Sequence, residues 1–306
     1  MEDITASESD SVDRYIEFFN ALVLVRKDEP EAVSAVDTML YFIKTYKTET
    51  MVELQKKMRE IIEKLVRIKV SMSVISACEL FVRFITLSSM DNDSFSECQR
   101  LLIQRGEMFV KNCINAKTVI GHQAQIFIKN GWKILTHSKS RVVLEIFKCA
   151  MQNDKLFEVF VPETRADMSG VHMNELLKSH GIKSTLILDS AVGYVMERID
   201  AIFIGCDGVV ESGGMLSRVG AYQMAVLARH AKVPVFVAVE TFKFVRFYPF
   251  KQIDVPNLVK YDEKNRSTSD HPSIDYTPPE LIKFFVTDIG VLTPTAVSDE
   301  LIKLYF

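Results

Sequence analysis

The spacing of apolar residues changes near residue 131, and this change limits the possible folds more than any other feature of the sequence. Before it, apolar residues recur every three or four positions, which is the period of one face of an α-helix. Between residues 10 and 104 there is no glycine, and the only proline, Pro30, suits the first turn of a helix. After it, short β-rich runs alternate with helix-like segments. The chain should therefore form a helical domain over residues 1–130 and a second domain over residues 131–306.

The first domain is expected to be a bundle of four or five helices. Its clearest pattern is an apolar stripe at helical spacing, formed by Leu54, Met58, Ile61, Leu65 and Ile68. Lys56 and Lys57 fall outside this stripe, in a basic run that is more typical of a solvated helix face than of a binding surface. Both interpretations of that run stay open at this point.

The second domain is expected to be Rossmann-like, with a parallel sheet and helices on both faces. Its β-rich runs lie at residues 133–136, 157–161, 184–188, 201–204 and 235–239. Helix-like segments separate them, at residues 141–151, 168–180, 191–199 and 219–231. Strands that alternate with helices in this way form parallel sheets. Further helices are expected to open at Gly213–Arg218 and at Thr277, where Glu280 completes a capping box, and the last helix to cover residues 296–305.

Charge and composition exclude several classes of protein. The 37 basic and 40 acidic residues give a net charge of −3, whereas proteins that coat nucleic acid need a basic excess. No apolar run approaches the ~20 residues that cross a bilayer. The five cysteines include no C-x-x-C pair, a pattern typical of reduced cytosolic proteins rather than of disulfide frameworks or zinc sites. We expect a cytosolic protein that has no metal site and contacts neither membranes nor nucleic acid directly.

Polar side chains follow the predicted strands, at the edge where open parallel sheets bind their ligands. The candidate binding residues are Thr136, His137, Ser138, Arg141, Arg165, Asp207, Ser217, Arg218 and Lys243. Two expected helix starts, at Ser138–Arg141 and Gly213–Arg218, would offer free N–H groups to a phosphate. The pattern indicates a pocket for a small phosphorylated, polyhydroxyl ligand.

Other catalytic chemistry has less support. The sequence contains no G-x-x-x-x-G-K-[ST], H-E-x-x-H or G-x-S-x-G motif. His137 and Ser138 are neighbours, so their side chains should point to opposite sides rather than pair. Asp189 and Asp207 follow strands that look adjacent and would share a site, although Asp189 is equally typical of a loop aspartate that caps the next helix. Cys206 is interpreted as a small buried apolar residue.

Several segments together resemble a known family. They are Leu135-Thr136-His137, Glu163-Thr164-Arg165, Gly205-Cys206-Asp207, Glu211-Ser212-Gly213-Gly214 and the region 277–290. This set is similar to the family that joins the regulatory subunits of translation initiation factor 2B to the isomerases of methylthioribose 1-phosphate and ribose 1,5-bisphosphate. The ending over 290–305, with residues 79–85, 188–194 and 242–246, resembles the alpha-subunit branch of that family. The resemblance covers almost the whole chain.

This resemblance implies a pocket that still binds a ligand but lacks a catalytic group of the isomerases. The isomerases of the family carry a cysteine directly after the Thr-His pair, where this chain has Ser138, and an aspartate that is kept here as Asp207. Their Asn-Lys pair is Ser217-Arg218. Near neutral pH a serine hydroxyl is a much poorer acid and nucleophile than a thiol. We therefore expect no catalytic residue and no cofactor but a bound sugar phosphate, and a working aldose–ketose isomerase is the alternative.

The resemblance also implies partners. By this comparison the chain would be a non-catalytic regulatory subunit, a homodimer that joins the beta, gamma, delta and epsilon subunits of the guanine nucleotide exchange factor for initiation factor 2. It would also sense the phosphorylated alpha subunit of initiation factor 2 during stress. Arg83, Lys56 and Lys57 are candidates to contact that phosphoserine. The apolar ending Leu304, Tyr305 and Phe306 is a candidate dimer contact, because apolar residues at a terminus are expected to be covered.

Overall fold

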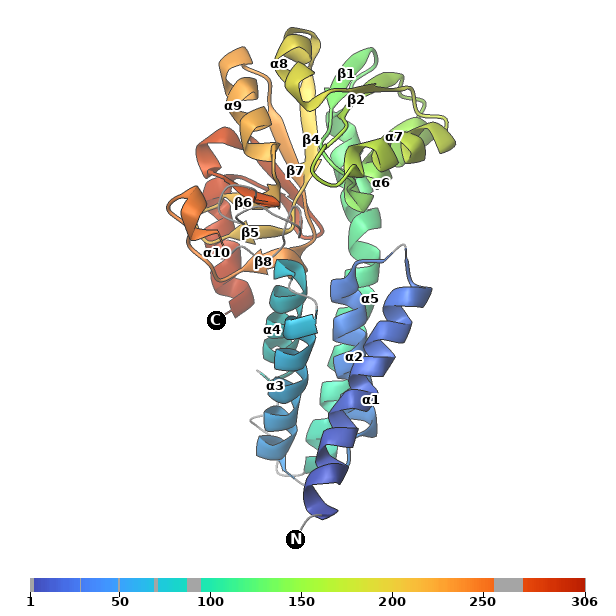
Figure 1. Cartoon of the computed structure of the whole chain (residues 1–306), viewed down its shortest axis with the longest axis vertical. Helices are drawn as coiled ribbons and strands as arrows, with labels where there is room; N and C mark the ends of the chain where they lie inside the picture. Colours follow the sequence, from blue (N-terminus) through green and yellow to red (C-terminus); the bar gives the residue numbers. More distant parts are fainter. Residues whose placement is uncertain are drawn as a thin grey trace, which may run out of the picture. The chain divides into compact units, whose positions relative to one another are not determined.

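The computed structural model describes residues 3–27, 29–48, 50–68, 71–86, 95–255 and 272–305 (Figure 1). It divides into two compact units, Met1–Asn115 and Ala116–Leu304. The division falls inside the long helix α5 (Phe95–Ala124), whereas the sequence placed a boundary near residue 130, where the helical period ends. The expected fold class, a helical region followed by an α/β region with a mostly parallel sheet, is confirmed.

Helices make up the N-terminal unit. They are α1 (Asp3–Val25), α2 (Glu31–Thr45), α3 (Met51–Ile68), α4 (Met72–Thr86) and the first part of α5. The predicted apolar stripe of α3 is buried at Leu54, Met58, Ile61 and Leu65. Its last member, Ile68, is 46% exposed, because the helix ends there and the residue lies beyond the packed turns. Helices α2 and α5 approach so closely that a Cβ on Gly106 would lie 2.7 Å from the Leu40 side chain.

A seven-stranded sheet forms the centre of the C-terminal unit, with the strand order β11-β10-β7-β4-β1-β2-β3. Its strands are β1 (Trp132–Leu135), β2 (Phe157–Pro162), β3 (Ser184–Ile187), β4 (Ala201–Gly205), β7 (Val235–Ala238), β10 (Phe284–Thr287) and β11 (Gly290–Leu292). The pairs from β10 to β3 are all parallel, and β11 is an antiparallel edge strand. The five strands that the sequence predicted are therefore all present.

Helices cover both faces of this sheet (Figure 1). They are α6 (Arg141–Gln152), α7 (Ser169–Ser179), α8 (Val192–Val195), α9 (Ala221–Ala231) and α10 (Pro294–Tyr305). The core on one face joins α6, α7 and the end of α5 to Ile134, Val159, Phe203 and Phe236. On the other face Arg198, which follows α8, lies over the ring of Phe160 at 5.8 Å. The central strands β4 and β7 are buried on both faces, which explains the continuous apolar runs at 201–204 and 235–239.

A second, four-stranded sheet was not predicted, and it corrects two of the expected helices. Its order is β8-β5-β6-β9, with β5 at Gly208–Val210, β6 at Met215–Arg218, β8 at Phe244–Val245 and β9 at Ile274–Thr277. Residues 213–218 therefore form a turn and a strand rather than a helix start. Thr277 ends a strand opposite Met215, and only a single 3₁₀ turn, Pro279–Leu281, follows it. Because Thr277 is buried and held in this strand pairing, it does not cap the turn, and the expected capping box does not form.

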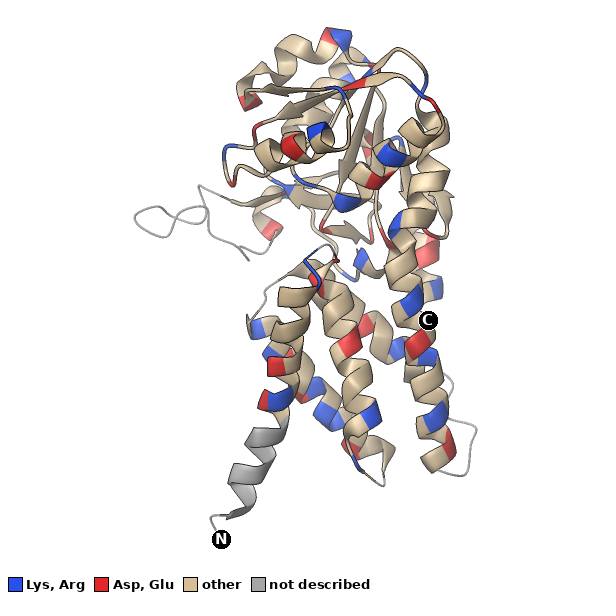
Figure 2. Ribbon diagram, turned by 90° about the vertical axis from the view of Figure 1, so that its right-hand side faces the viewer, with Lys and Arg blue, Asp and Glu red and all other residues tan. Residues whose placement is uncertain are grey.

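Basic and acidic side chains are interspersed along the helices of each unit (Figure 2). Within the described residues, no helix is both long enough and apolar enough to span a bilayer.

Candidate functional site

The candidate site is a cavity of about 200 Å³ at the carboxyl ends of β1, β4 and β7, called here the central cavity. Seven of the nine predicted binding residues line it: His137, Ser138, Arg141, Asp207, Ser217, Arg218 and Lys243. Lys139, Ser140, Val142, Gly205, Cys206 and Glu240 complete the lining. The carboxyl edge of the sheet thus brings these groups together, as the order of strands and loops predicted.

The loop after β1 turns sharply into helix α6. Ser138 has a left-handed backbone with φ of 58°, and its hydroxyl lies 2.7 Å from that of Ser169, with which it shares a hydrogen bond. Ser140 caps α6, since its Oγ accepts a hydrogen bond from the Val143 N–H at 3.3 Å. The exposed Lys139 and the half-buried Arg141 lie beside this helix start. A helix N-terminus with two nearby cations is a favourable place for a phosphate.

The loop after β4 is held between that helix start and the second sheet. A Cβ on Gly205 would lie only 2.3 Å from the Ser140 Oγ, so the strand end and the helix cap meet only because residue 205 is glycine. Ser217 donates a hydrogen bond to the Gly205 carbonyl oxygen at 2.8 Å. The Asp207 N–H donates to the Leu216 carbonyl oxygen at 2.8 Å. Strand β6 therefore fixes where Asp207 stands in the central cavity.

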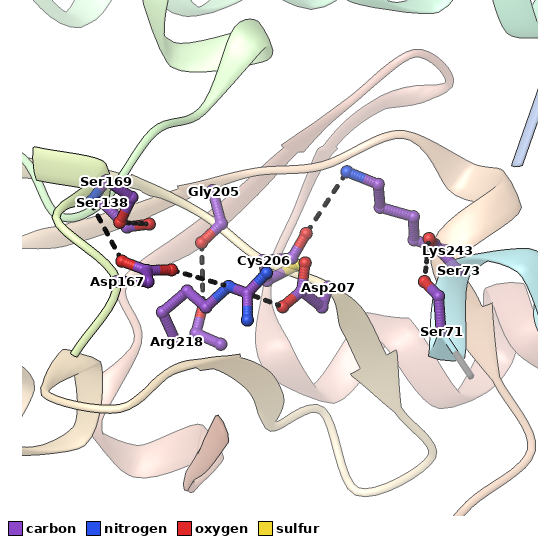
Figure 3. A network of polar contacts seen from close by, with 11 residues as sticks. Ser71, Ser73, Ser138, Asp167, Ser169, Gly205, Cys206, Asp207, Arg218 and Lys243 are labelled. Atoms are coloured by element: carbon purple, nitrogen blue, oxygen red, sulfur yellow. Dashed lines mark hydrogen bonds and ion pairs between the residues drawn. The ribbon is translucent and has the colours of Figure 1, made fainter. Parts of the chain in front are cut away.

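Arg218 is a half-exposed cation of the central cavity, and it forms long ion pairs with two carboxylates (Figure 3). Its Nε lies 3.7 Å from Asp167 Oδ2 and 3.9 Å from Asp207 Oδ2. All three side chains are between 38% and 39% exposed. Because such long, half-exposed pairs contribute little energy, the guanidinium can turn to an anionic ligand at small cost.

Lys243 is a mostly buried cation of the central cavity, with 16% of its side chain exposed. Its Nζ lies 2.8 Å from Glu240 Oε2 and donates to the Cys206 carbonyl oxygen at 3.3 Å (Figure 3). Burial alone would lower the pKa of Lys243, but Glu240, Cys206 and Asp207 raise it above its ordinary value. Lys243 therefore carries a full positive charge at neutral pH, and Glu240 neutralises it.

Two further groups in the cavity have pKa values that limit its chemistry. Burial raises the pKa of the Cys206 thiol far above its ordinary range, which leaves it protonated at neutral pH. Burial lowers the pKa of His137 to about 4, although Asp189 and Asp167 oppose this shift. The cavity thus holds a neutral imidazole and no thiolate. The interpretation of Cys206 as a buried apolar residue agrees with its 6% exposure.

Arg165 and Thr136 lie outside the central cavity. Arg165 lines a second cavity of about 200 Å³, which His137 shares with the central cavity. Thr136 lines neither of the two and is completely buried. Asp189 also lines the second cavity, where it accepts hydrogen bonds from the Thr164 and Arg165 N–H groups at 2.9 and 2.7 Å.

The expectation that Asp189 and Asp207 share one site is therefore wrong. Asp189 follows β3 and Asp207 follows β4, and strands β1 and β2 lie between them. The two strands are consecutive in the sequence, but the crossover places β4 on the far side of β1. Asp189 holds the backbone of the loop after β2, which is a structural role close to the capping alternative.

The second expected phosphate site, at residues 213–218, does not exist as a helix start. Helix α9 begins after Gly220 instead, and a carboxylate of the protein already occupies its N-terminus. Asp275 Oδ2 accepts hydrogen bonds from the Gly220 and Tyr222 N–H groups at 2.7 and 3.1 Å. Burial raises the pKa of Asp275 to about 7, and these two hydrogen bonds limit the shift.

Glu240, Asp167 and Ser169 contact predicted residues of the central cavity although they were not themselves among the predicted set. Glu240 stands in the segment that follows β7, so the rule that placed Lys243 in the site also applies to it. Asp167 stands in the loop between β2 and α7 and Ser169 begins α7, and their contacts depend on how that loop folds back toward β1. No local sequence signal indicates that approach.

The candidate partner contacts differ in accessibility. Lys56 is exposed on α3, whereas Lys57 is half-buried and pairs with Glu60 at 2.9 Å. Arg83 is half-buried in α4. Leu304 is half-buried at the end of α10, while the Tyr305 side chain and Phe306 fall outside the described residues.

Comparison with known proteins places these features in a family. The sequence profile of the Initiation factor 2 subunit family matches residues 24–294. A Caenorhabditis elegans protein named translation initiation factor eIF2B subunit alpha is 38% identical over 282 residues, covering 90% of this chain and 92% of that protein. The Dictyostelium discoideum protein of the same name is 35% identical over 292 residues, covering 90% and 91%.

The chain is also similar to an enzyme and to a solved assembly. Ribose 1,5-bisphosphate isomerase of Archaeoglobus fulgidus is 30% identical over 213 residues, which cover 66% of this chain and 67% of the enzyme. A chain in the crystal structure of the tetrameric eIF2B-beta2-delta2 complex from C. thermophilum superposes with a TM-score of 0.78 at 18% identity. That superposition covers 100% of this chain and 99% of the other, and it supports the fold alone.

Proposed function

Because this chain belongs to the initiation factor 2 subunit family, we propose that it is a non-catalytic regulatory subunit of initiation factor 2B, the guanine nucleotide exchange factor for translation initiation factor 2. The observation that carries the proposal is the near full-length similarity to two proteins named as the alpha subunit, at 38% and 35% identity. In this proposal the chain works in the cytosol and the exchange chemistry belongs to another subunit.

The proposed partners follow from the same assignment. Two copies of the chain would form a homodimer that joins the beta, gamma, delta and epsilon subunits, with the apolar end of α10 near Leu304 in the contact. The helical unit would read the phosphorylated alpha subunit of initiation factor 2. Lys56 is the better placed of its candidate contacts, because it is exposed and Lys57 already pairs with Glu60.

The central cavity is proposed to bind a sugar phosphate without turning it over. The helix start at Ser140 and the cations Arg141 and Arg218 favour a phosphate, and Asp207 suits a hydroxyl of the sugar. Catalysis has less support, because Ser138 stands where the related isomerases have their cysteine. The buried thiol of Cys206 does not replace that group, since its raised pKa keeps it protonated.

A working sugar-phosphate isomerase is the second candidate, and the 30% identity to ribose 1,5-bisphosphate isomerase favours it. It would require catalysis through Asp207 in the absence of the thiol. Incubation of the purified chain with ribose 1,5-bisphosphate or methylthioribose 1-phosphate separates the two candidates, because only an isomerase would form the ketose.

The regulatory role is tested by native purification of the tagged chain and measurement of the mass of its assembly. The proposal expects one large complex that contains two copies of this chain and four other kinds of subunit. Recovery of a free dimer alone would contradict the proposal and would return the isomerase to first place.

A further inference from the structure

A second surface of the C-terminal unit has the properties of a peptide-binding groove. It lies at the amino ends of β7 and β10, so it is at the opposite edge of the sheet from the central cavity. Its volume is about 660 Å³, and none of its lining residues belongs to the central cavity. We call it the amino-edge groove. Neither the regulatory role nor the sugar-phosphate pocket makes use of it.

The rim of the groove is basic. Arg229, Lys232 and Lys283 line it together with a single acid, Glu280. All three cations are exposed, and within the described part of the chain none of them pairs with a carboxylate. Some other lysines of the unit do pair with carboxylates: Lys183 lies 3.4 Å from Glu158, and Lys243 lies 2.8 Å from Glu240. A local positive excess in a chain of net charge −3 calls for an explanation.

Helix stability explains only part of this excess. Arg229 lies in the last turn of α9 and Lys232 directly follows that helix, where cations interact favourably with the helix dipole. Lys283 lies on no helix, since it precedes β10, and its Nζ stands 5.5 Å from the ring centroid of Phe284. The groove therefore collects a third cation from a different element.

The floor of the groove is apolar and its backbone is already hydrogen-bonded. Val233, Pro234 and Leu281 are half-buried there, and Ile282 is 6% exposed. The Val233 N–H donates to Ala228, and the Lys283 N–H donates to Val235, both at 2.9 Å. A partner would thus bind through its side chains rather than by adding a strand.

Prolines restrict the backbone of both walls. Lys232 closes α9 in a left-handed conformation, with φ of 59°, and Pro234 follows it. On the other wall Pro278 precedes, and Pro279 begins, the 3₁₀ turn that carries Leu281. Because proline fixes φ, little chain entropy remains to be lost when a partner is bound.

We propose that the amino-edge groove binds an extended acidic peptide segment of a partner protein, with Asp or Glu side chains on the basic rim and Leu or Ile side chains on the apolar floor. Charge complementarity selects the acidic residues, and the aliphatic floor selects against a bare polyanion. The described lining contains no aromatic ring on which a base would stack, so a single-stranded nucleic acid fits less well.

The test uses fluorescence anisotropy of the full-length chain with a labelled peptide of about twelve residues, half of them Asp or Glu and a third Leu or Ile. The double variant Lys232→Glu/Lys283→Glu should bind this peptide about tenfold more weakly or worse. The matched control, Lys111→Glu/Lys178→Glu, changes the net charge equally at two exposed lysines outside the groove and should bind like the parent chain. Leu281→Ser should weaken binding at about 300 mM NaCl, where screening leaves the apolar contact dominant.

Three outcomes would overturn the proposal. Equal weakening by the control variant would show nonspecific attraction between charges. If an all-glutamate peptide binds as tightly as the mixed peptide and Leu281→Ser has no effect, the apolar floor does not contribute to binding. Tighter binding of a single-stranded RNA of the same length, lost in the Lys232→Glu/Lys283→Glu variant, would assign the groove to nucleic acid instead.

Discussion

At the scale of single residues, burial shifts the pKa of several side chains away from their ordinary values. Asp275 is the clearest case, because its carboxylate fixes the first N–H groups of α9 while burial raises its pKa to about 7. Its Oδ1 has no hydrogen-bond partner among the described residues. The carboxylate therefore stabilises the helix start at a cost that depends on pH.

Replacement of Asp275 by Asn should remove this pH dependence. In the unfolded chain the carboxyl has a pKa near 3.9, so between about pH 4 and pH 7 the native state retains a proton that the unfolded state has lost. The parent chain should lose stability as pH rises through that window, by on the order of 1.4 kcal/mol per pH unit, and level off above pH 7. The amide of Asn can still accept the two N–H groups and has no proton to lose.

The measurement is the melting temperature of both proteins from pH 4 to pH 8. The melting temperature of the Asp275→Asn variant minus that of the parent should increase up to about pH 7 and then stay constant. A difference that is independent of pH would show that Asp275 is charged throughout and that the raised pKa is wrong.

Cys206 gives a second prediction at this scale. The thiolate is the reactive form of cysteine, and burial raises the pKa of this thiol, so iodoacetamide should not modify Cys206 in the native chain at pH 8. All five cysteines are buried, and after unfolding in denaturant all five should react. Peptide mass mapping after a short exposure checks both statements. Rapid native alkylation confined to Cys206 would restore it as a candidate nucleophile beside Asp207.

At the scale of elements, the start of α6 joins two loops of the central cavity through Ser140. The variant Ser140→Ala should reduce the free energy of unfolding by about 1 kcal/mol, because it removes the hydroxyl that accepts the Val143 N–H. Gly205→Ala should cost more, since its Cβ would overlap that hydroxyl. The exposed Ser190 is the matched control, and Ser190→Ala should leave stability within about 0.5 kcal/mol of the parent. Urea unfolding of the three variants measures these effects, and equal stability of Ser140→Ala and Ser190→Ala would refute the role of the cap.

The elements also show which parts of the fold the sequence can predict. The run 235–239 is apolar throughout, and 157–161 is apolar except for Glu158, so their strand type and the burial of their apolar residues follow from composition and length. Ser140 and the start of α6 were equally predictable, because a capping residue directly precedes an apolar helical pattern. The second sheet was not, since Met215–Arg218 pairs not only with the nearby Gly208–Val210 but also with Ile274–Thr277, more than fifty residues away. Such pairing is nonlocal and leaves no periodic signal.

The site was predictable to the same extent and for the same reason. Residues in the segments that follow strands, such as Ser138, Asp207 and Lys243, reach the central cavity because the parallel sheet collects strand ends at one edge. Arg165 also follows a strand, but β2 lies farther along the sheet, and its loop borders the second cavity. Strand order decides which loops meet, and strand order is set by crossovers that the local sequence does not encode.

At the scale of the whole molecule, a ligand of the central cavity should act as a stabiliser of the fold. The cavity is assembled from the ends of β1, β4 and β7 together with β6, so it exists only in the folded chain. A compound that binds only the native state adds RT ln(1 + [L]/Kd) to stability, about 2.7 kcal/mol at a hundredfold excess over Kd. For a unit of this size the melting temperature should then rise by roughly 5–10 °C.

Differential scanning fluorimetry with ribose 5-phosphate, other sugar phosphates, unphosphorylated ribose and inorganic phosphate measures this effect. The variant Arg218→Ala should lose most of this rise in melting temperature, because it removes a cation that can turn to the phosphate. Its own ion pairs are long and weak, so they do not hold it back. Lys178→Ala, at an exposed lysine of α7 away from the cavity, is the control and should keep the shift in full. If no sugar phosphate raises the melting temperature of the parent chain, the cavity is not a sugar-phosphate site. If inorganic phosphate alone raises the melting temperature as much as the sugar phosphates do, the helix start binds only the anion. Asp207 would then have no role in binding a sugar hydroxyl.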